Sequence, residues 1–252
     1  MSSPLLQFDR DLVRENGCRC IIGADEAGRG ALAGPVVSAA IMLPESFYRS
    51  SWCRRCSPEI NDSKQLSPSR RDSVYREVLR LQNDSDLAFS VGVSSVQEIE
   101  SLNVLGATRL SFQRAIEGIQ KTTAFSIVDP DSDQARFSDR DFKIRSATDA
   151  VDSLILIDGL PLRPFPYGHR ALVKGDARSL AIALASIIAK VTRDRIMREL
   201  DHHLPAYGFA RNKGYGTQAH RRAIVANGPA YAHRPTFLRK LLSQAIQTEW
   251  FL

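Results

Sequence analysis

Four acidic residues lie at the ends of short apolar runs, where their carboxylates could take part in chemistry. They are Asp25, Glu26, Asp158 and Asp176. If the runs are strands of one sheet, the four carboxylates repel one another, and the usual remedies are raised pKa values or bound divalent cations. Because all the ligand atoms would be oxygens, Mg²⁺ or Mn²⁺ is favoured over zinc. In two-metal phosphoryl transfer, such cations stabilise both the attacking and the leaving oxygen.

Positive charge is concentrated in the second part of the chain. The net charge is +6, but residues 163–252 hold 15 Lys or Arg against 5 Asp or Glu, whereas residues 1–162 carry a net charge of −4. On charge alone, a nucleic-acid partner and a solvated basic face explain this pattern equally well. Together with the four acids, the charge favours a metal-dependent nuclease. Arg211 and Lys213 are the strongest candidates for phosphate contacts.

Hydrophobic periodicity predicts the elements that position these residues. Apolar runs predict strands at residues 20–24, 36–42, 87–93, 154–157 and 171–174. Helical spacing predicts helices at residues 68–83, 96–102, 106–119, 179–203 and 218–226, and another after Pro235. Ser67 and Pro68 have the types expected at an N-cap and a first helical position.

The length of 252 residues predicts one main domain with an appendage. We assign residues 1–200 to the main domain, with an irregular insertion at about residues 121–152, and residues 201–252 to a basic helical extension packed on it. No apolar run approaches the roughly 20 residues that span a bilayer, and four cysteines are too few for a disulfide scaffold. We therefore expect a cytoplasmic protein without a membrane partner.

Two other kinds of site match the sequence less well. Residues 23–30 resemble a P-loop, but Arg29 replaces its lysine and Gly30 its serine or threonine, and two acids would lie inside the phosphate cradle. An ATP- or GTP-hydrolysing site is therefore not expected. The pairs Cys18/Cys20 and Cys53/Cys56 could form a four-thiolate zinc site, although cysteine in a core strand commonly acts as a small apolar residue.

Six sequence blocks, in order along the chain, carry a resemblance to a known family. They are Asp25-Glu26-Ala27-Gly28-Arg29-Gly30-Ala31-Leu32-Ala33-Gly34-Pro35-Val36, Asn61-Asp62-Ser63-Lys64-Gln65-Leu66-Ser67, Asp158-Gly159, Lys174-Gly175-Asp176, Ala185-Ser186-Ile187-Ile188-Ala189-Lys190-Val191-Thr192-Arg193-Asp194 and Lys213-Gly214-Tyr215-Gly216-Thr217. With these blocks the chain closely resembles type 2 ribonuclease H (ribonuclease HII) from about residue 18 to residue 240.

The resemblance implies an α/β chain with a ribonuclease H-like fold. This fold has a mixed five-stranded sheet flanked by helices, here with a helical C-terminal extension that helps to hold the duplex. The implied activity is that of an endonuclease that cuts the RNA strand of RNA/DNA hybrids. It also nicks duplex DNA 5′ of embedded ribonucleotides, leaving 3′-hydroxyl and 5′-phosphate ends. Such an enzyme removes misincorporated ribonucleotides and RNA primers, and we expect it to be a monomer.

The resemblance also implies roles for individual residues. The four acids would be catalytic and would bind Mn²⁺ or Mg²⁺, with two ions present during catalysis. Gly28, Arg29 and Gly30, together with Tyr215, would read the ribose 2′-hydroxyl, the one group that distinguishes a ribonucleotide from a deoxyribonucleotide. Lys64 would contact a phosphate.

Other interpretations of these residues remain open. A junction resolvase or another metal-dependent nuclease of the same fold would need the acids but not Tyr215 or the Gly-Arg-Gly element. A non-catalytic nucleic-acid binder would need only basic charge, and clustered acids would weaken its binding. Each acid could instead cap a turn, and Tyr215 could have a purely structural role, packing the extension against the sheet.

Overall fold

Five strands form one mixed sheet. The structure, a computed structural model, describes residues 3–60, 66–123 and 153–249. Its strands are β1 (Cys20–Ala27), β2 (Val36–Pro44), β3 (Ala88–Ser94), β4 (Ser153–Asp158) and β5 (Arg170–Leu172). Their order is β3-β2-β1-β4-β5, with β1, β4 and β5 parallel and β2 antiparallel to both of its neighbours. The predicted mixed five-stranded sheet is confirmed.

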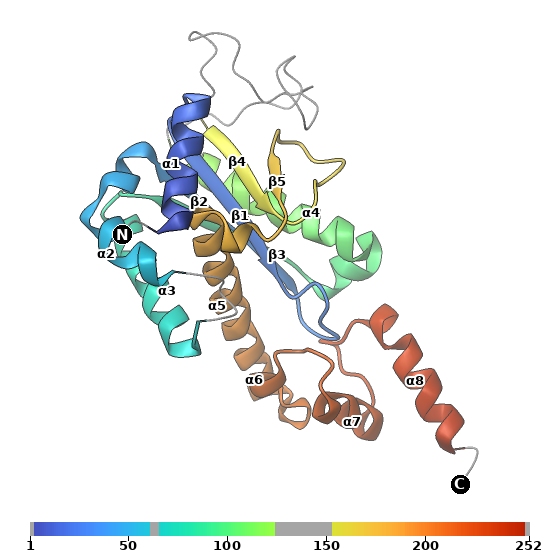
Figure 1. The fold of residues 1–252 in the computed structure, drawn as a ribbon. Coiled ribbons are helices and arrows are strands. Elements are labelled where there is room, and N and C mark those ends of the chain that lie inside the picture. Colours follow the sequence, from blue (N-terminus) through green and yellow to red (C-terminus); the bar gives the residue numbers. More distant parts are fainter. Residues whose placement is uncertain (1–2, 61–65, 124–152, 250–252) are drawn as a thin grey trace.

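Helices cover both faces of the sheet. They are α1 (Pro4–Asn16), α2 (Ser51–Cys56), α3 (Pro68–Asn83), α4 (Val96–Thr122), α5 (Leu180–His203), α6 (Phe209–Asn212), α7 (Gln218–Asn227) and α8 (Pro235–Glu249). The helix α4 packs on one face, and α1, α3 and α5 pack on the other (Figure 1). Over the described residues, no helix combines the length and apolarity needed to cross a membrane.

Successive strand residues contribute to two different cores. In β1, Ile21 belongs to the core beneath α1, α3 and α5, whereas Ile22 belongs to the core beneath α4. In β4, Leu156 and Ile157 divide in the same way, because successive side chains of a strand point to opposite faces. Since helices cover both faces, these strands are continuous apolar runs, which is the pattern that predicts them from sequence.

The helix α5 begins against the middle of β1. The Ser179 hydroxyl accepts a hydrogen bond from the main-chain N–H of Ile182 at 3.3 Å and so caps the helix. A Cβ atom at Gly23 would lie 2.3 Å from the main chain of Ala181, so only glycine permits this approach. The contact brings the first turns of α5 close to the acidic end of β1.

The helix α4 contains the interruption that the sequence predicts between residues 102 and 106. Asn103 has a φ of 57° inside the element. Its side-chain oxygen accepts hydrogen bonds from the main-chain N–H groups of Leu105 and Gly106 at 2.9 and 3.2 Å, and so caps the second part of the helix. This part continues to Thr122, past the predicted start of the insertion. Residues 124–152, which make up most of the insertion, lie outside the described residues.

A buried carboxylate joins α1 to α5. Asp9 is fully buried and accepts a hydrogen bond from the Ala181 N–H at 2.9 Å. The Tyr48 hydroxyl also donates to it, at 3.4 Å. Burial raises the pKa of Asp9 to about 7, although the hydrogen bonds that it accepts act in the opposite direction. The N-terminal helix, which the sequence patterns did not predict, therefore carries a carboxylate that costs stability when it ionises.

Replacing Asp9 with asparagine is expected to remove a pH-dependent loss of stability. The folded chain keeps the Asp9 proton up to about pH 7, whereas the ordinary pKa is 3.8, so the folded state binds more protons between these values. Wild-type stability therefore falls as the pH rises, and the advantage of the variant should grow to about 4 kcal/mol at alkaline pH. Urea unfolding of both chains at about pH 5 and about pH 8 measures this difference. An equal difference at the two pH values would contradict the prediction.

The four cysteines are free thiols. Burial raises the pKa of Cys18 to about 11 and that of Cys53 to about 12, so both thiols are protonated near neutral pH. Cys18, Cys53 and the partly buried Cys56 pack in or against the core beneath α1, α3 and α5. They therefore act as small apolar side chains.

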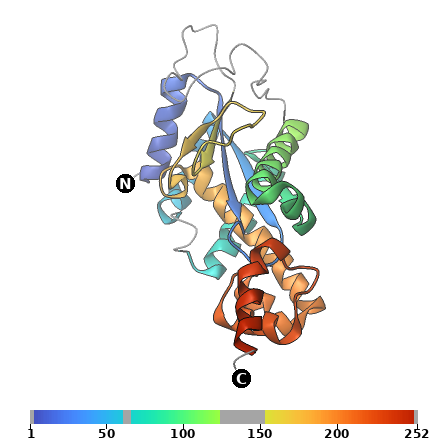
Figure 2. The ribbon, with the colours of Figure 1, turned by 90° about the vertical axis from the view of Figure 1, so that its right-hand side faces the viewer.

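The helices α6, α7 and α8 form the C-terminal extension, at the far end of α5 from the sheet (Figure 2). Phe209, Ile224 and Leu238 are buried in a separate small core. Met197 of α5 and Ala33, which follows β1, belong to the same core. This packing joins the extension both to α5 and to the segment that leaves the acidic end of β1.

Candidate active site

The strand register brings acids of two neighbouring strands to one edge of the sheet. Asp25 and Glu26 lie near the carboxyl end of β1, and Asp158 is the last residue of β4. The two strands are parallel and paired as far as Ala24 and Ile157. Asp25 and Asp158 are the residues that follow this last pair, so they reach the same edge.

The fourth acid, Asp176, follows β5 on a turn. The strand β5 ends two residues earlier than predicted because Lys174 adopts a left-handed conformation, with φ 55°, at the start of a 3₁₀ turn, η4 (Gly175–Ala177). The Gly175 N–H in this turn donates a hydrogen bond to Oδ1 of Asp158 at 2.6 Å. Asp176 is buried, with 4% of its surface exposed. The turn thus connects the segment of Asp176 directly to the carboxylate of Asp158.

Asp25 is a buried carboxylate next to other negative charges. Burial, followed by the charges of Glu26 and Asp158, raises its pKa well above the usual range. Two hydrogen bonds act in the opposite direction: the Ser186 side chain provides one, and the Glu26 N–H donates the other to Oδ1 at 2.7 Å. The carboxylates of Asp25, Glu26 and Asp158 therefore interact electrostatically, as the strand-end pattern predicts.

Glu26 is partly neutralised by Arg29, which lies in the loop that follows β1. The arginine Nη1 is 3.0 Å from Oε1 of Glu26, and the Arg29 side chain is 49% exposed. Burial raises the pKa of Glu26, and the hydrogen bond and charge of Arg29 oppose this rise. Because one partner is well solvated, the pair contributes little to stability.

The oxygen ligands at this edge suit Mg²⁺ or Mn²⁺. A divalent cation would offset the repulsion that raises the pKa of Asp25, because it favours the ionised carboxylates. In the part of the chain that the structure describes, no three His, Cys, Asp or Glu side chains are arranged to hold one ion together. Because Arg29 already donates a hydrogen bond to Glu26 at 3.0 Å, a cation would compete with it for that carboxylate.

A buried arginine of α5 holds the loop after β1 against the extension. Arg193 is fully buried and donates hydrogen bonds to the carbonyls of Ala33 and Pro35 at 3.0 Å and of Lys213 at 2.9 Å. Gly28 has a φ of 100°, and a Cβ there would lie 2.1 Å from Nε of Arg193. Glycine is therefore required at this predicted site position, both for its conformation and for the space that the guanidinium occupies.

A second buried arginine binds the same loop from the extension. Arg234, just before α8, donates hydrogen bonds to the carbonyls of Gly28 at 2.8 Å, Arg29 at 2.9 Å and Gly34 at 2.8 Å. Burial lowers the pKa of Arg234 to about 9. Neither arginine is predicted as a site residue from the sequence, because arginine is usually exposed and main-chain carbonyls can belong to any residue type. Only the position of Arg193 inside one of the six blocks could have indicated it.

Tyr215 lies at the surface next to this loop. Its neighbour Gly214 accepts a hydrogen bond from the Leu32 N–H at 2.8 Å, which joins the two segments. The Tyr215 ring lies 5.3 Å from the Arg193 guanidinium, and the residue is 38% exposed. A Cβ at Gly30 would meet no atom within 4 Å, so the space beside that glycine is open. The structure therefore brings together the loop and the tyrosine that are distant in sequence.

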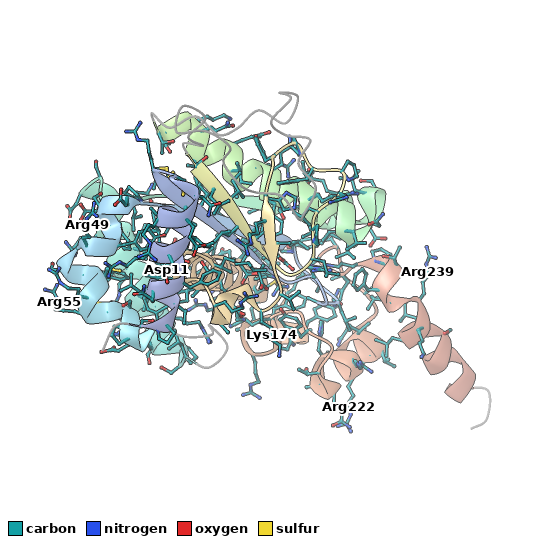
Figure 3. The ribbon with its side chains drawn as sticks, turned by 45° about the horizontal axis from the view of Figure 1, so that its top comes forward. Asp11, Arg49, Arg55, Lys174, Arg222 and Arg239 are labelled. Atoms are coloured by element: carbon teal, nitrogen blue, oxygen red, sulfur yellow. The ribbon has the colours of Figure 1, made fainter. Side chains whose placement is uncertain are left out.

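The predicted phosphate contacts have different surroundings. Arg211 is exposed on α6, whereas Lys213 is partly buried and its ammonium donates to a main-chain carbonyl. Burial lowers the pKa of Lys213. Lys64 lies outside the described residues. Figure 3 shows Arg222 and Arg239 projecting from α7 and α8 away from the sheet, so the extension has basic groups on its surface.

Most of the sequence matches one family. The family model of ribonuclease HII matches residues 22–242. Ribonuclease HII of Syntrophotalea carbinolica is 39% identical over 232 residues, which cover 92% of this chain and 91% of that protein. Ribonuclease HII of Bacillus thuringiensis (strain Al Hakam) is 39% identical over 225 residues, which cover 89% of this chain and 71% of that protein.

Solved structures share the fold. Ribonuclease H2 from Pyrococcus horikoshii OT3 aligns with a TM-score of 0.55 and 22% identity, over 90% of this chain and 99% of that one. Bst-RNase HIII in complex with Mn²⁺ aligns with a TM-score of 0.61 and 17% identity, over 93% of this chain and 73% of that one. This likeness confirms the predicted ribonuclease H-like fold. Because the family model and the relatives match most of the sequence, the chain belongs to the ribonuclease HII family and is a ribonuclease H endonuclease.

Proposed function

We propose that this endonuclease hydrolyses the RNA strand of RNA/DNA hybrids and nicks duplex DNA 5′ of embedded ribonucleotides, leaving 3′-hydroxyl and 5′-phosphate ends. One juxtaposition supports the proposal most directly. The interacting carboxylates at the end of β1 are continuous with the loop that packs beside the exposed Tyr215. The carboxylates suit hydrolysis of a phosphodiester, and the loop with its tyrosine suits contact with a ribose. The role of the endonuclease would be the removal of misincorporated ribonucleotides and RNA primers.

The acids Asp25, Glu26, Asp158 and Asp176 would hold two Mg²⁺ or Mn²⁺ ions during catalysis. When bound, such ions supply an activated water and stabilise the charge on the leaving oxygen. The Glu26 N–H orients the carboxylate of Asp25, and the Gly175 N–H orients that of Asp158. Burial of Asp25 keeps bulk water away from its carboxylate, which strengthens its electrostatic interactions. A Mn²⁺ complex of a type 3 relative with the same fold supports the choice of ion.

The loop and the extension would bind the duplex from two sides. The open space beside Gly30 allows a sugar-phosphate backbone to approach closely. We propose that Gly28, Gly30 and Arg29 contact the scissile nucleotide while Tyr215 packs on the adjacent sugar. Phosphates further along would be contacted by the basic side chains proposed for this role, which are Lys64, Arg211 and Lys213.

Cleavage of three matched duplexes tests the function. One duplex is all DNA, one carries a single ribonucleotide in one strand, and one is an RNA/DNA hybrid, each assayed with Mg²⁺, with Mn²⁺ and with a chelator. We expect cleavage of only the two ribonucleotide-containing duplexes, and only with metal. A nuclease that does not recognise ribose would also cut the DNA duplex. A non-catalytic nucleic-acid binder would leave all three duplexes uncut.

A further inference from the structure

Two buried histidines of the extension contact each other behind Tyr215. His220 of α7 and His233, which precedes α8, are 0% and 2% exposed. Their Nε2 atoms lie 3.1 Å apart. Nδ1 of His220 lies 2.9 Å from the carbonyl oxygen of Tyr215, and the Ala230 N–H points at Nδ1 of His233 at 3.0 Å. All four ring nitrogens of the pair thus have a defined neighbour.

The neighbours determine the position of each proton. A carbonyl oxygen can only accept, so Nδ1 of His220 must carry a hydrogen and Nε2 of a neutral His220 must accept. Nε2 of His233 must then donate to it, which leaves Nδ1 of His233 as an acceptor. Nδ1 of His233 lies 3.0 Å from the Ala230 N–H and 3.3 Å from the Ala230 carbonyl oxygen, so the shorter of its two contacts is with the donor. For two neutral rings, the contact between His220 and the Tyr215 carbonyl therefore specifies one tautomer for each ring.

Both rings are neutral near neutral pH. Burial lowers the pKa of His220, and it lowers that of His233 to about 4, where the neighbouring His220 acts in the same direction. Phe209 and Tyr207 pack against the pair, with the Phe209 ring 5.4 Å from the His220 ring and the Tyr207 ring 4.7 Å from the His233 ring. If both rings were protonated, two N–H groups would face each other across the Nε2–Nε2 contact.

The pair connects Tyr215 to the loop beside the acids. The Tyr215 carbonyl accepts from His220 and also from the Thr217 N–H at 2.8 Å, so two donors fix its direction. On the other side of the pair, the neighbours of His233 bond to the loop after β1. The Gly34 N–H donates to the Ala232 carbonyl at 2.8 Å, next to the bridge between Ala33 and His233.

We propose that His220 and His233 form a relay of hydrogen bonds that positions Tyr215 for ribose recognition. The histidines are positioning residues: His220 contacts the Tyr215 main chain, His233 contacts His220, and both are too deeply buried to reach the substrate. Their effect is to hold the exposed ring of Tyr215 at a set distance from the loop of residues 28–34. This inference rests on the proposed function, because that function assigns ribose contact to Tyr215.

The ratio of nicking rates on duplexes with and without one ribonucleotide distinguishes a role in positioning Tyr215 from a general loss of structure. The His220→Leu variant should lower the ratio of nicking rates on duplexes with and without one ribonucleotide about five- to tenfold, the range for one lost hydrogen bond. Partial unfolding would lower both activities equally and leave the ratio unchanged. His220→Gln should recover part of the ratio, because its amide can donate to the Tyr215 carbonyl. The control His203→Gln, at an exposed histidine at the end of α5, should keep the wild-type ratio.

A double-mutant cycle tests whether His220 acts through Tyr215. If it does, adding His220→Leu to Tyr215→Ala should change the ratio little, because the side chain that it positions is already absent. Additive effects would overturn the proposal. If His220→Leu does not fold, the same cycle is measured with His220→Gln.

Nitrogen NMR of the wild-type chain tests the relay without activity. We expect the hydrogen on Nδ1 in His220 and on Nε2 in His233, with a scalar coupling between the two Nε2 atoms. The same tautomer in both rings, or a charged ring at neutral pH, would overturn the proposal. A wild-type chain that shows the coupling but nicks no ribonucleotide-containing duplex would instead contradict the proposed function.

Discussion

The Asp25→Asn variant is expected to cleave ribonucleotide-containing duplexes about a thousandfold more slowly than the wild type, in Mg²⁺ and in Mn²⁺. The substitution removes one negative charge from the acids at the edge of the sheet without a change in volume. Asp25 is buried and its charge is opposed by Glu26 and Asp158. Neutralising it therefore should not lower the stability of the fold, so the loss should appear in the cleavage rate while hybrid binding is kept.

The Asp9→Asn variant is the matched control for this experiment. Asp9 is also a buried aspartate with a raised pKa, but it lies on α1 and bonds to the first turn of α5. The Asp9→Asn variant should therefore cleave ribonucleotide-containing duplexes at close to the wild-type rate. Single-turnover cleavage and hybrid binding are measured for both variants. If Asp25→Asn retained near-normal rates with both metals, the assignment of Asp25 as a metal ligand would be wrong.

Replacing Tyr215 is expected to reduce discrimination between ribonucleotides and deoxyribonucleotides. A site that hydrogen-bonds a substrate hydroxyl can reject an analogue without it by about 10⁴-fold, because the polar groups of the site are left unpaired. Tyr215→Ala removes both the ring and the hydroxyl, so it should lose most of this factor. Tyr215→Phe keeps the ring beside Arg193 and should lose less. Nicking rates on duplexes with and without one ribonucleotide give the ratio for each variant.

Thermal unfolding distinguishes this role from simple packing. Tyr215 is 38% exposed, so its truncation should cost little stability, about 1 kcal/mol or less. Tyr231, 65% exposed in the same extension, is the control position, and Tyr231→Ala should change neither property. If Tyr215→Ala melted at a much lower temperature yet nicked normally when folded, the packing interpretation would be correct.

The positions of the acids can be predicted from local sequence, because each acid lies at or just after an apolar run that forms a strand. Asp158 ends an apolar run that is buried on both faces, and Asp176 follows a shorter one, so strand ends can be located to within a few residues without tertiary information. The same kind of signal was present for α1, with Pro4 at its first turn and Gly17 in a left-handed C-cap at φ 59°. That helix was therefore predictable, although it was not predicted.

The surroundings of those acids depend on contacts between distant segments. Arg193 and Arg234 are fully buried against main-chain carbonyls far away in the chain. Every residue type has a carbonyl, so such bonds leave no pattern in the sequence of the acceptor. The sequence by itself determines which side chains could react and that the acids lie near strand ends. The distance between loop and tyrosine follows only from folding, because it is set by which carbonyls become buried together.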